Sequence, residues 1–341
     1  MIWLITGGCG FVGANLADFL LGEGKEVVLF DNMNRVGSKN NLDWLRSRHG
    51  NSWRFIEGDI RNFDETNRLL KVTNPDVLAH LAGQVAMTTS IENPRLDFDV
   101  NALGTFNILD AVRLYSASTI VLYSSTNKVY GSLDHLSYVE SDTRFTLPEF
   151  PNGFDEFLPL DGYSPYGCSK LAAEQYVRDF YRIYKIPTVV FRHSSMYGRR
   201  QFATYDQGWI GWYCAKSLEM KESDSPECTV SGNGKQVRDV LHADDLIQVY
   251  AKAVQNIGRT SGKTYNIGGG MENSLSLLEL FQVLEEWTGN KMRYRLLDWR
   301  QGDQKVFVAD NTKANDDMGW FPSIPKEDGL RRMAEWSSSI F

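Results

Sequence analysis

Short apolar runs alternate with segments of helical spacing along most of the chain. Runs such as 2–5, 27–30 and 120–123 consist of Ile, Val, Leu and aromatic residues, which is typical of strands covered on both faces of a sheet. Segments between them, such as 15–21, place apolar residues three or four apart and predict helices. This order predicts an α/β fold with a doubly wound parallel sheet. The predicted strands are 2–5, 27–30, 53–57, one ending at His80, 120–126 and 188–192; the main predicted helices are 15–21, 94–115, 166–184 and 280–287.

A glycine-rich turn lies between the first predicted strand and the first predicted helix. Residues 6–13 read Thr-Gly-Gly-Cys-Gly-Phe-Val-Gly, and Asp31 ends the second strand about 20 residues later. In this setting Gly7 allows the turn, Gly10 lets the backbone approach a pyrophosphate, and Gly13 allows close helix packing. The free N–H groups of the helix start would bind the anion, while Asp31 would bind the adenosine ribose and repel a 2′-phosphate. The pattern predicts a Rossmann-type domain that binds NAD rather than NADP.

Composition narrows the classes of function. The 341 residues include 36 basic and 43 acidic side chains, and the net charge of −7 argues against a nucleic-acid-binding protein. The four cysteines form no C-x-x-C pair and the five histidines no H-E-x-x-H cluster, so we expect free thiols and no metal. No apolar run reaches the ~18 residues of a membrane span, and no signal peptide is evident. We expect a cytoplasmic protein without membrane or nucleic-acid partners.

A tyrosine and a lysine form the candidate catalytic pair. Tyr166 and Lys170 stand four residues apart and share one face of a predicted helix. An ammonium beside a phenol favours the phenolate, so we expect the pKa of Tyr166 to move from about 10 toward neutrality. Such a tyrosine can exchange a proton with a sugar hydroxyl if another group takes the hydride. Alone, the pair more often marks an exposed helix face, but the strand 120–126 delivers hydroxyls to the same sheet edge, and Thr126 becomes the third candidate.

Further motifs resemble the short-chain dehydrogenase/reductase superfamily, starting with the glycine spacing G-x-x-G-x-x-G. Residues 58–61 match its adenine contact, 80–83 its loop beneath the nicotinamide, and Asn101 its structural asparagine. The length and the Gly-Trp-Phe-Pro stretch at 319–322 resemble the extended branch, which acts mostly on nucleotide sugars. The cofactor-binding residues that this resemblance implies are Gly7, Gly10, Phe11, Val12, Gly13, Asp31, Asn32, Asn34, Arg35, Asp59, Ile60, Leu81, Ala82, Gly83, Gln84, Asn101, Ser124, Tyr166, Lys170 and Ser194.

Longer motifs narrow the resemblance to the family of CDP-paratose 2-epimerases, also called CDP-tyvelose epimerases. They lie at residues 84–90, 124–131, 192–198, 201–209 and 231–242, and the likeness extends over nearly the whole chain. The resemblance implies that the enzyme oxidises C2 of CDP-paratose transiently with bound NAD and then returns the hydride to the opposite face of the sugar. The product, CDP-tyvelose, serves lipopolysaccharide O-antigen biosynthesis. The resemblance therefore implies an isomerase.

The resemblance also assigns roles to residues. Tyr166 would act as base and then acid, Lys170 would hold the nicotinamide ribose, and Thr126 would bridge the phenol and the substrate hydroxyl. Arg238 and Arg300 match diphosphate-contacting positions of the extended branch, where a guanidinium offers a planar fork of donors. The substrate-binding residues implied for a CDP-sugar are Gln84, Thr126, Lys128, Ser195, Gln236, Arg238 and Arg300.

Asn127 and Lys128 separate this chain from the sugar-nucleotide 4,6-dehydratases of the same branch. Those enzymes have Asp-Glu directly after the threonine, because removing water across C5 and C6 needs an acid and a base. An amide and an ammonium stand here instead, which argues against dehydration. Our hypothesis is that Lys128 stabilises negative charge that develops on the keto oxygen.

Three other functions are compatible with the same sequence. A UDP-sugar 4-epimerase of the same branch would share every catalytic residue, so only the pocket motifs argue against it. A net dehydrogenase would have to release NADH in each cycle. A non-catalytic nucleotide-binding relative would have kept the fold, although the intact Thr126, Tyr166 and Lys170 speak against that.

The chain is expected to divide into two interleaved lobes. We assign residues 1–193, with 237–268 returning, to the NAD-binding domain, and 194–236 with 269–341 to a smaller α/β nucleotide-sugar lobe. Residues 132–163 read as a loop-rich excursion at the carboxyl edge of the sheet. The branch commonly forms dimers through a four-helix contact, so a homo-oligomer, either a dimer or a tetramer, is expected.

Two local patterns belong to the smaller lobe. Trp209, Trp212 and Tyr213 recur on one helical stripe, which we interpret as core. Ser276 followed three residues later by Glu279 predicts a capping box at the start of a helix.

Overall fold

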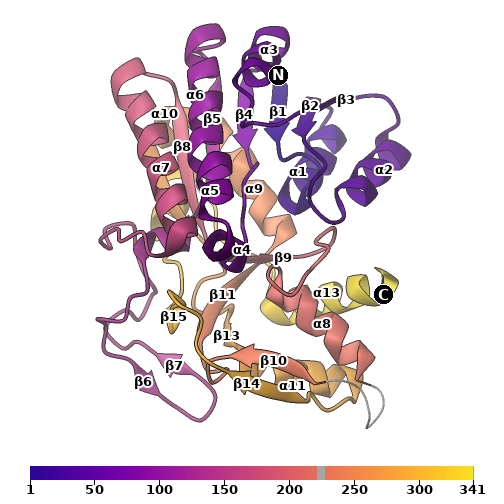
Figure 1. Ribbon diagram of the computed structural model, residues 1–341, viewed down its shortest axis with the longest axis vertical. Coiled ribbons are helices and arrows are strands. Elements are labelled where there is room, and N and C mark those ends of the chain that lie inside the picture. The colour runs from indigo at the N-terminus through magenta and orange to yellow at the C-terminus, as the bar shows by residue number, and fades with distance from the viewer. Residues whose placement is uncertain (221–226, 341) are drawn as a thin grey trace.

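A seven-stranded sheet forms the centre of the larger lobe in the computed structural model, which describes residues 1–220 and 227–340 (Figure 1). Residues 221–226 and 341 of the expected nucleotide-sugar lobe lie outside the described residues. All neighbouring strands run parallel, which confirms the predicted fold class. In spatial order the strands are β12 (Lys263–Ile267), β8 (Thr188–His193), β5 (Ile120–Thr126), β4 (Val77–His80), β1 (Ile2–Thr6), β2 (Glu26–Asp31) and β3 (Arg54–Glu57).

Helices cover both faces of this sheet, which explains the continuous apolar runs of its strands. Trp3 and Ile5 of β1 face one core and Leu4 faces the other, because successive strand side chains point to opposite faces. One face packs against α1 (Phe11–Gly22), α2 (Ser38–His49), α9 (Ala243–Gln255) and α12 (Thr312–Met318). The other packs against α3 (Phe63–Thr73), α6 (Gly104–Tyr115) and α7 (Ser164–Tyr184).

The smaller lobe has its own sheets and core, on the side of the carboxyl ends of the large sheet (Figure 1). One sheet holds β9 (Ser195–Tyr197), β11 (Val237–His242), β13 (Ser274–Ser276) and β15 (Val306–Phe307); the other pairs β10 (Cys228–Ser231) with β14 (Tyr294–Leu297). Helices α8 (Trp209–Glu219), α11 (Leu277–Thr288) and α13 (Lys326–Ile340) bury Phe281 and Met333 against them. Ser276 and Glu279 form the predicted capping box at the start of α11.

The segment expected to return to the larger lobe is shared between the two lobes. Strand β11 pairs with β9, β13 and β15 of the smaller lobe, whereas α9 and β12 belong to the larger. We therefore propose that the chain returns to the larger lobe at residue 243 and not at residue 237. The sequence could not separate the two, because the residues of β11 do not show which sheet the strand joins.

Two further segments differ from their predictions. The expected helix 94–115 contains a π-helical turn, η1 (Asp99–Leu103), between α5 (Pro94–Phe98) and α6. The excursion 132–163 includes a short hairpin of β6 (Val139–Glu140) and β7 (Phe145–Thr146), held to the smaller lobe by an ion pair of Arg144 with Glu279. The remaining elements are α4 (Met87–Glu92), η2 (Asn127–Tyr130) and α10 (Ile257–Thr260). Within the described residues, no helix combines the length and the apolar character needed to cross a membrane.

Candidate active site

The glycine-rich turn after β1 is built as its spacing predicts. Gly7 has φ +67°, and a Cβ there would lie 2.7 Å from the backbone nitrogen of Ala82. A Cβ at Gly13 would lie 2.7 Å from the Cα of Gly8 and closer still to the carbonyl oxygen of Gly7. Gly10 precedes α1 without a side-chain cap, so the first N–H groups of the helix are left for an anion.

A cavity of about 520 Å³ opens in front of this turn. Every residue predicted to bind the cofactor lines it, with the exception of Asn101. Asn101 lies behind the wall: its amide group accepts a hydrogen bond from the N–H of Gln84 and donates one to the carbonyl of the same residue, both at 3.0 Å. Asn101 therefore does not line the cavity itself. It holds in place the loop that does.

Two carboxylates at the ends of β2 and β3 fit the adenosine half of a dinucleotide. Asp31 is buried, accepts hydrogen bonds from the N–H groups of Cys9 and Met33, and has its pKa raised by burial. Burial also opposes ionisation of Asp59, but hydrogen bonds from Arg61 and Asn32 outweigh it and lower its pKa to about 2. Both groups are ready acceptors, and the glycine turn has room for the pyrophosphate, so the residues present fit NAD.

A segment of the smaller lobe closes over this cavity. Asn15 donates to the carbonyl of Arg199, and Asn41 donates to that of Arg200. The guanidinium of Arg200 lies 4.2 Å from the ring centre of Trp44 on α2 and 4.4 Å from that of Trp336 on α13. Stacking of one cation between two indoles joins the lobes across the cofactor cavity.

Helix α7 brings the candidate catalytic groups to the carboxyl ends of β5 and β8. Thr126, Tyr166 and Lys170 are all buried, and all three line the cofactor cavity. The ammonium of Lys170 donates to the carbonyl of Ser124 at 2.5 Å and lies 4.5 Å from the ring centre of Tyr123. Tyr166 and Thr126 share a hydrogen bond. We propose these three side chains as the catalytic set.

The expected lowering of the Tyr166 pKa is wrong for the protein without its cofactor. Burial raises the pKa of Tyr166 to about 12, and the hydrogen bond to Thr126 offsets only part of that. Lys170 does not counter it, because its ammonium is directed at Ser124 and Tyr123; burial lowers the pKa of Lys170 itself to about 8. Helical spacing placed the pair on one face but could not give the direction of the ammonium.

A second cavity of about 300 Å³ adjoins the first. The two share Thr126, Tyr166, Ser194 and Ser195, so the phenol stands at their junction. Every residue predicted to bind substrate lines this second cavity except Gln84. The side chain of Gln84 instead hydrogen-bonds the backbone of Ala86 and the carboxylate of Asp97.

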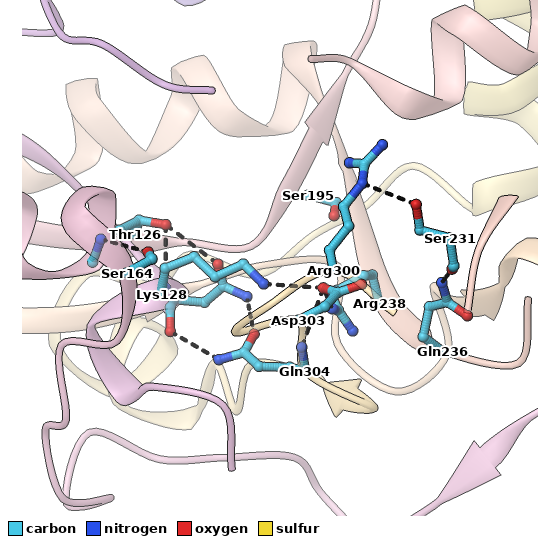
Figure 2. A network of polar contacts seen from close by, with 12 residues as sticks. Thr126, Lys128, Ser164, Ser195, Ser231, Gln236, Arg238, Arg300, Asp303 and Gln304 are labelled. Atoms are coloured by element: carbon cyan, nitrogen blue, oxygen red, sulfur yellow. Dashed lines mark hydrogen bonds and ion pairs between the residues drawn. The ribbon is translucent and has the colours of Figure 1, made fainter. Parts of the chain in front are cut away.

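Three cations, Lys128, Arg238 and Arg300, line the second cavity near Asp303 (Figure 2), and Asp206 is the other acid that lines it. The ammonium of Lys128 lies 3.2 Å from Asp303 Oδ1, and Arg238 lies 2.7 Å from the same oxygen. Arg300 donates to the hydroxyl of Ser231 at 3.2 Å. Burial opposes ionisation of Asp303, but Lys128 and Arg238 lower its pKa overall; burial also lowers the pKa of Lys128 to about 8. The excess of positive charge suits a diphosphate.

Asn127, the other departure from the dehydratase pattern, is tied to the protein. Its amide donates to Gln304 Oε1 at 3.0 Å, and Gln304 donates back to the Asn127 carbonyl. No group of three or more His, Cys, Asp or Glu side chains that could hold a metal ion occurs within residues 1–220 and 227–340.

Sequence reasoning missed several residues of the second cavity. Trp209, Trp212 and Tyr213 pack in or against the core of the smaller lobe, as predicted, and all three also line the second cavity. Their single stripe indicated a buried helix face without telling a core from a pocket. Asp303 was also missed as a participant, and its position after the diphosphate-type Arg300 was the only signal in the sequence.

Comparison with known proteins agrees with this geometry. The family model for GDP-mannose 4,6 dehydratase matches residues 4–333. The chain belongs to the GDP-mannose 4,6 dehydratase family. Within that family it is 54% identical over 337 residues to CDP-paratose 2-epimerase of Salmonella typhi, covering 99% of each chain. It is 31% identical to a putative UDP-glucose 4-epimerase of Methanocaldococcus jannaschii, covering 98% of this chain and 97% of the other.

Solved structures of this family share the fold along the whole chain. UDP-glucuronic acid 4-epimerase from Bacillus cereus, in complex with UDP-glucuronic acid and NAD, superposes with a TM-score of 0.85 at 26% identity and covers 100% of both chains. UDP-glucose 4-epimerase from Thermotoga maritima with UDP-glucose gives a TM-score of 0.84 at 26% identity, covering 100% of this chain and 99% of the other. The predicted membership of the extended dehydrogenase/reductase branch is thereby confirmed.

Gly13→Ala should weaken the retention of NAD, because the added methyl group would collide with the backbone of Gly7 and Gly8. We expect NAD affinity to fall roughly tenfold or more, which corresponds to at least about 1.4 kcal/mol. Gly22→Ala is the matched control on the same helix, since a Cβ there meets nothing within 4 Å. NAD released from the purified proteins by acid would be quantified, with circular dichroism to check folding. Equal NAD content in the two variants would contradict the assignment of the turn.

Proposed function

We propose that this chain is an NAD-dependent CDP-paratose 2-epimerase, an isomerase that yields CDP-tyvelose. The reaction class is carried by one observation, the position of Tyr166 and Thr126 at the junction of a dinucleotide cavity and a cation-rich cavity. The choice of substrate is supported by the 54% identity to the Salmonella typhi enzyme over almost the whole of both chains. The NAD named in the Bacillus cereus structure supports the cofactor.

The chemistry divides between the cofactor and the side chains of the chain. NAD, held by the glycine turn, Asp31 and Asp59, would supply the acceptor and donor of hydride. Tyr166 takes the proton of the C2 hydroxyl through its hydrogen bond with Thr126, while the C2 hydrogen leaves as hydride. The resulting keto-sugar turns in the pocket, C2 receives the hydride on its other face, and Tyr166 returns the proton to oxygen. Electrons and protons balance over the cycle, so no net redox change occurs.

Lys128 is proposed to stabilise the sugar oxygen while C2 is a carbonyl. Its ammonium lies in the same cavity as Tyr166 and Thr126, and Asp303 holds it at 3.2 Å. A buried cation next to a developing negative charge lowers the barrier, because little water is present to screen it. Arg238 and Arg300 are proposed to bind the diphosphate.

The chain is further proposed to act in the cytoplasm as a homo-oligomer, with the CDP-sugar as its small-molecule partner. Exposed aromatic and aliphatic side chains of α6 and α7 support the oligomer: Phe106 and Tyr176 pack edge to face at 5.2 Å and remain 37% and 48% exposed. Helices α6 and α7 lie side by side at the edge of the larger lobe (Figure 1). Two such pairs would form a four-helix contact.

The function is tested by proton NMR of the purified protein with CDP-paratose and no added cofactor. A second set of anomeric signals, with the coupling changed as inversion at C2 requires, is the expected result. Interconversion of UDP-glucose and UDP-galactose, with CDP-paratose unchanged, would instead assign the chain to the 4-epimerases, the second candidate favoured by the Methanocaldococcus jannaschii relative. No reaction of any of these sugars, even with added NAD, would contradict both assignments.

Lys128→Met should lower kcat roughly 100- to 1,000-fold with a small effect on KM, as loss of a preorganised donor to an oxyanion does. Lys128→Arg should recover part of kcat because it restores the charge. If the ammonium bound the diphosphate instead, KM would rise and kcat would change little. Full turnover by the methionine variant would refute the role.

Light scattering after gel filtration should give a mass of two or four times 38.8 kDa. The double variant Phe106→Glu with Tyr176→Glu should shift it to 38.8 kDa, because charge on the proposed contact opposes burial. Phe157→Glu is the control, since Phe157 is 91% exposed on the segment 132–163. A monomeric wild type would argue against the oligomer.

A further inference from the structure

A buried carboxylate outside the proposed catalytic set lies behind the active site. Asp97 of α5 has none of its surface exposed. Its Oδ1 accepts hydrogen bonds from Gln84 at 2.8 Å and Asn101 at 3.1 Å, and its Oδ2 accepts one from Ser169 at 2.5 Å. The amide groups of Gln84 and Asn101 act as donors and the carboxylate as acceptor; burial raises the pKa of Asp97, and these hydrogen bonds together with the charge of Lys170 offset part of that rise.

The three partners of Asp97 come from three different segments around the active site. Gln84 ends the loop 81–84, which lines the cofactor cavity. Asn101 lies in the π-helical turn η1, and the wider turn places its amide against both Gln84 and Ser169. Ser169 lies on α7 directly before Lys170, and its hydroxyl is 3.1 Å from the carbonyl of Tyr166. A π-helical turn inside a helix is rare and often marks a functional site.

The charge of Asp97 differs from that of the other acid near Lys170. Glu174 forms an ion pair with Arg192 at 2.5 Å, so its charge is compensated. No Lys, Arg or His lies within ion-pair distance of Asp97 among the residues that the structure describes. Asp97 is therefore the acid near Lys170 whose charge is not already balanced by another side chain.

We propose that Asp97 is a positioning residue of the reaction: it ties the loop 81–84 and the start of α7 together and provides the counter-charge of Lys170. The proposal deepens the proposed function, and it rests on that function only in taking Tyr166 and Lys170 as the proton-transfer pair.

Electrostatics within the site agrees with this role. Burial lowers the pKa of Lys170, whereas Asp97 and Glu174 raise it. Asp97 also contributes to the raised pKa of Tyr166, after the larger effect of burial. The other titratable groups around Lys170 are His80, His193 and Tyr123; burial holds the pKa of each histidine at about 3 and raises that of Tyr123, so all three are neutral at the working pH. The charge that Lys170 experiences therefore depends mainly on Asp97.

Asp97→Asn should move both the acidic and the basic limb of the pH profile of kcat/KM to lower pH. Removing a negative charge destabilises the Lys170 ammonium and favours the Tyr166 phenolate, so both pKa values fall, by roughly one unit. Asp99→Asn is the matched control, two residues along, where the carboxylate accepts hydrogen bonds from the exposed Arg95. Its profile should not move. The sugar nucleotide is whichever one turns over in the NMR experiment, so failure of the C2 assignment leaves this test intact.

A second variant tests the hydrogen bonds of Asp97 separately from its charge, and it also tests the proposal if Asp97→Asn does not fold. Ser169→Ala keeps the carboxylate but removes its link to α7, so kcat should fall roughly tenfold, about 1.4 kcal/mol, without a shift of either limb. Thermal unfolding and NAD binding, followed by fluorescence, would accompany each variant. If the pH profile of Asp97→Asn did not shift, Asp97 would not be the counter-charge of Lys170. If Ser169→Ala kept the wild-type kcat, the hydrogen bond between Asp97 and α7 would not position the catalytic pair.

Discussion

A buried ion pair fixes the helix on which the active site depends. Glu174 of α7 and Arg192 of β8 lie 2.5 Å apart with 0% and 3% of their side chains exposed. Ser125 of β5 donates to the same carboxylate, and Arg192 also donates to the hydroxyl of Tyr130. Removing one partner of such a pair leaves a buried charge and typically costs about 3–5 kcal/mol. The pair therefore holds α7, with Lys170 one turn and Tyr166 two turns earlier, at the carboxyl ends of β5 and β8.

The buried acids around that helix differ in their partners, and the partners determine how much negative charge each acid leaves unbalanced. Glu174 is fully paired, which suits a structural role. Asp303 lies against both Lys128 and Arg238, which leaves the second cavity positive and suited to a diphosphate. Asp97 has only neutral hydrogen-bond donors, so its field extends to Lys170. A buried carboxylate would thus serve packing at Glu174, the proposed ligand binding at Asp303 and the proposed proton transfer at Asp97, depending on its partners.

Local patterns predicted much of the fold and the cofactor cavity. The glycine turn, Asp31 and the strand that ends at Thr126 lie where spacing placed them, because each depends on residues close together in sequence. Contacts between distant segments could not be predicted in the same way. Asp97 meets Ser169 across 72 positions, and β11 joins the smaller sheet through β9, β13 and β15. The direction of the Lys170 ammonium, and with it the sign of the Tyr166 pKa shift, depends on the carbonyl of Ser124 and the ring of Tyr123.

The raised pKa of Tyr166 is a consequence of the same burial that makes the site useful. A phenol with a pKa of about 12 is neutral at working pH and cannot take a proton from a sugar. Ionisation then requires added positive charge beside it, and Lys170 alone, directed elsewhere, does not supply enough. Charge brought by the oxidised cofactor would change that balance in a cavity with little water to screen it. Coupling the proposed base to the loaded cofactor would confine deprotonation of the hydroxyl to the complex that holds a hydride acceptor.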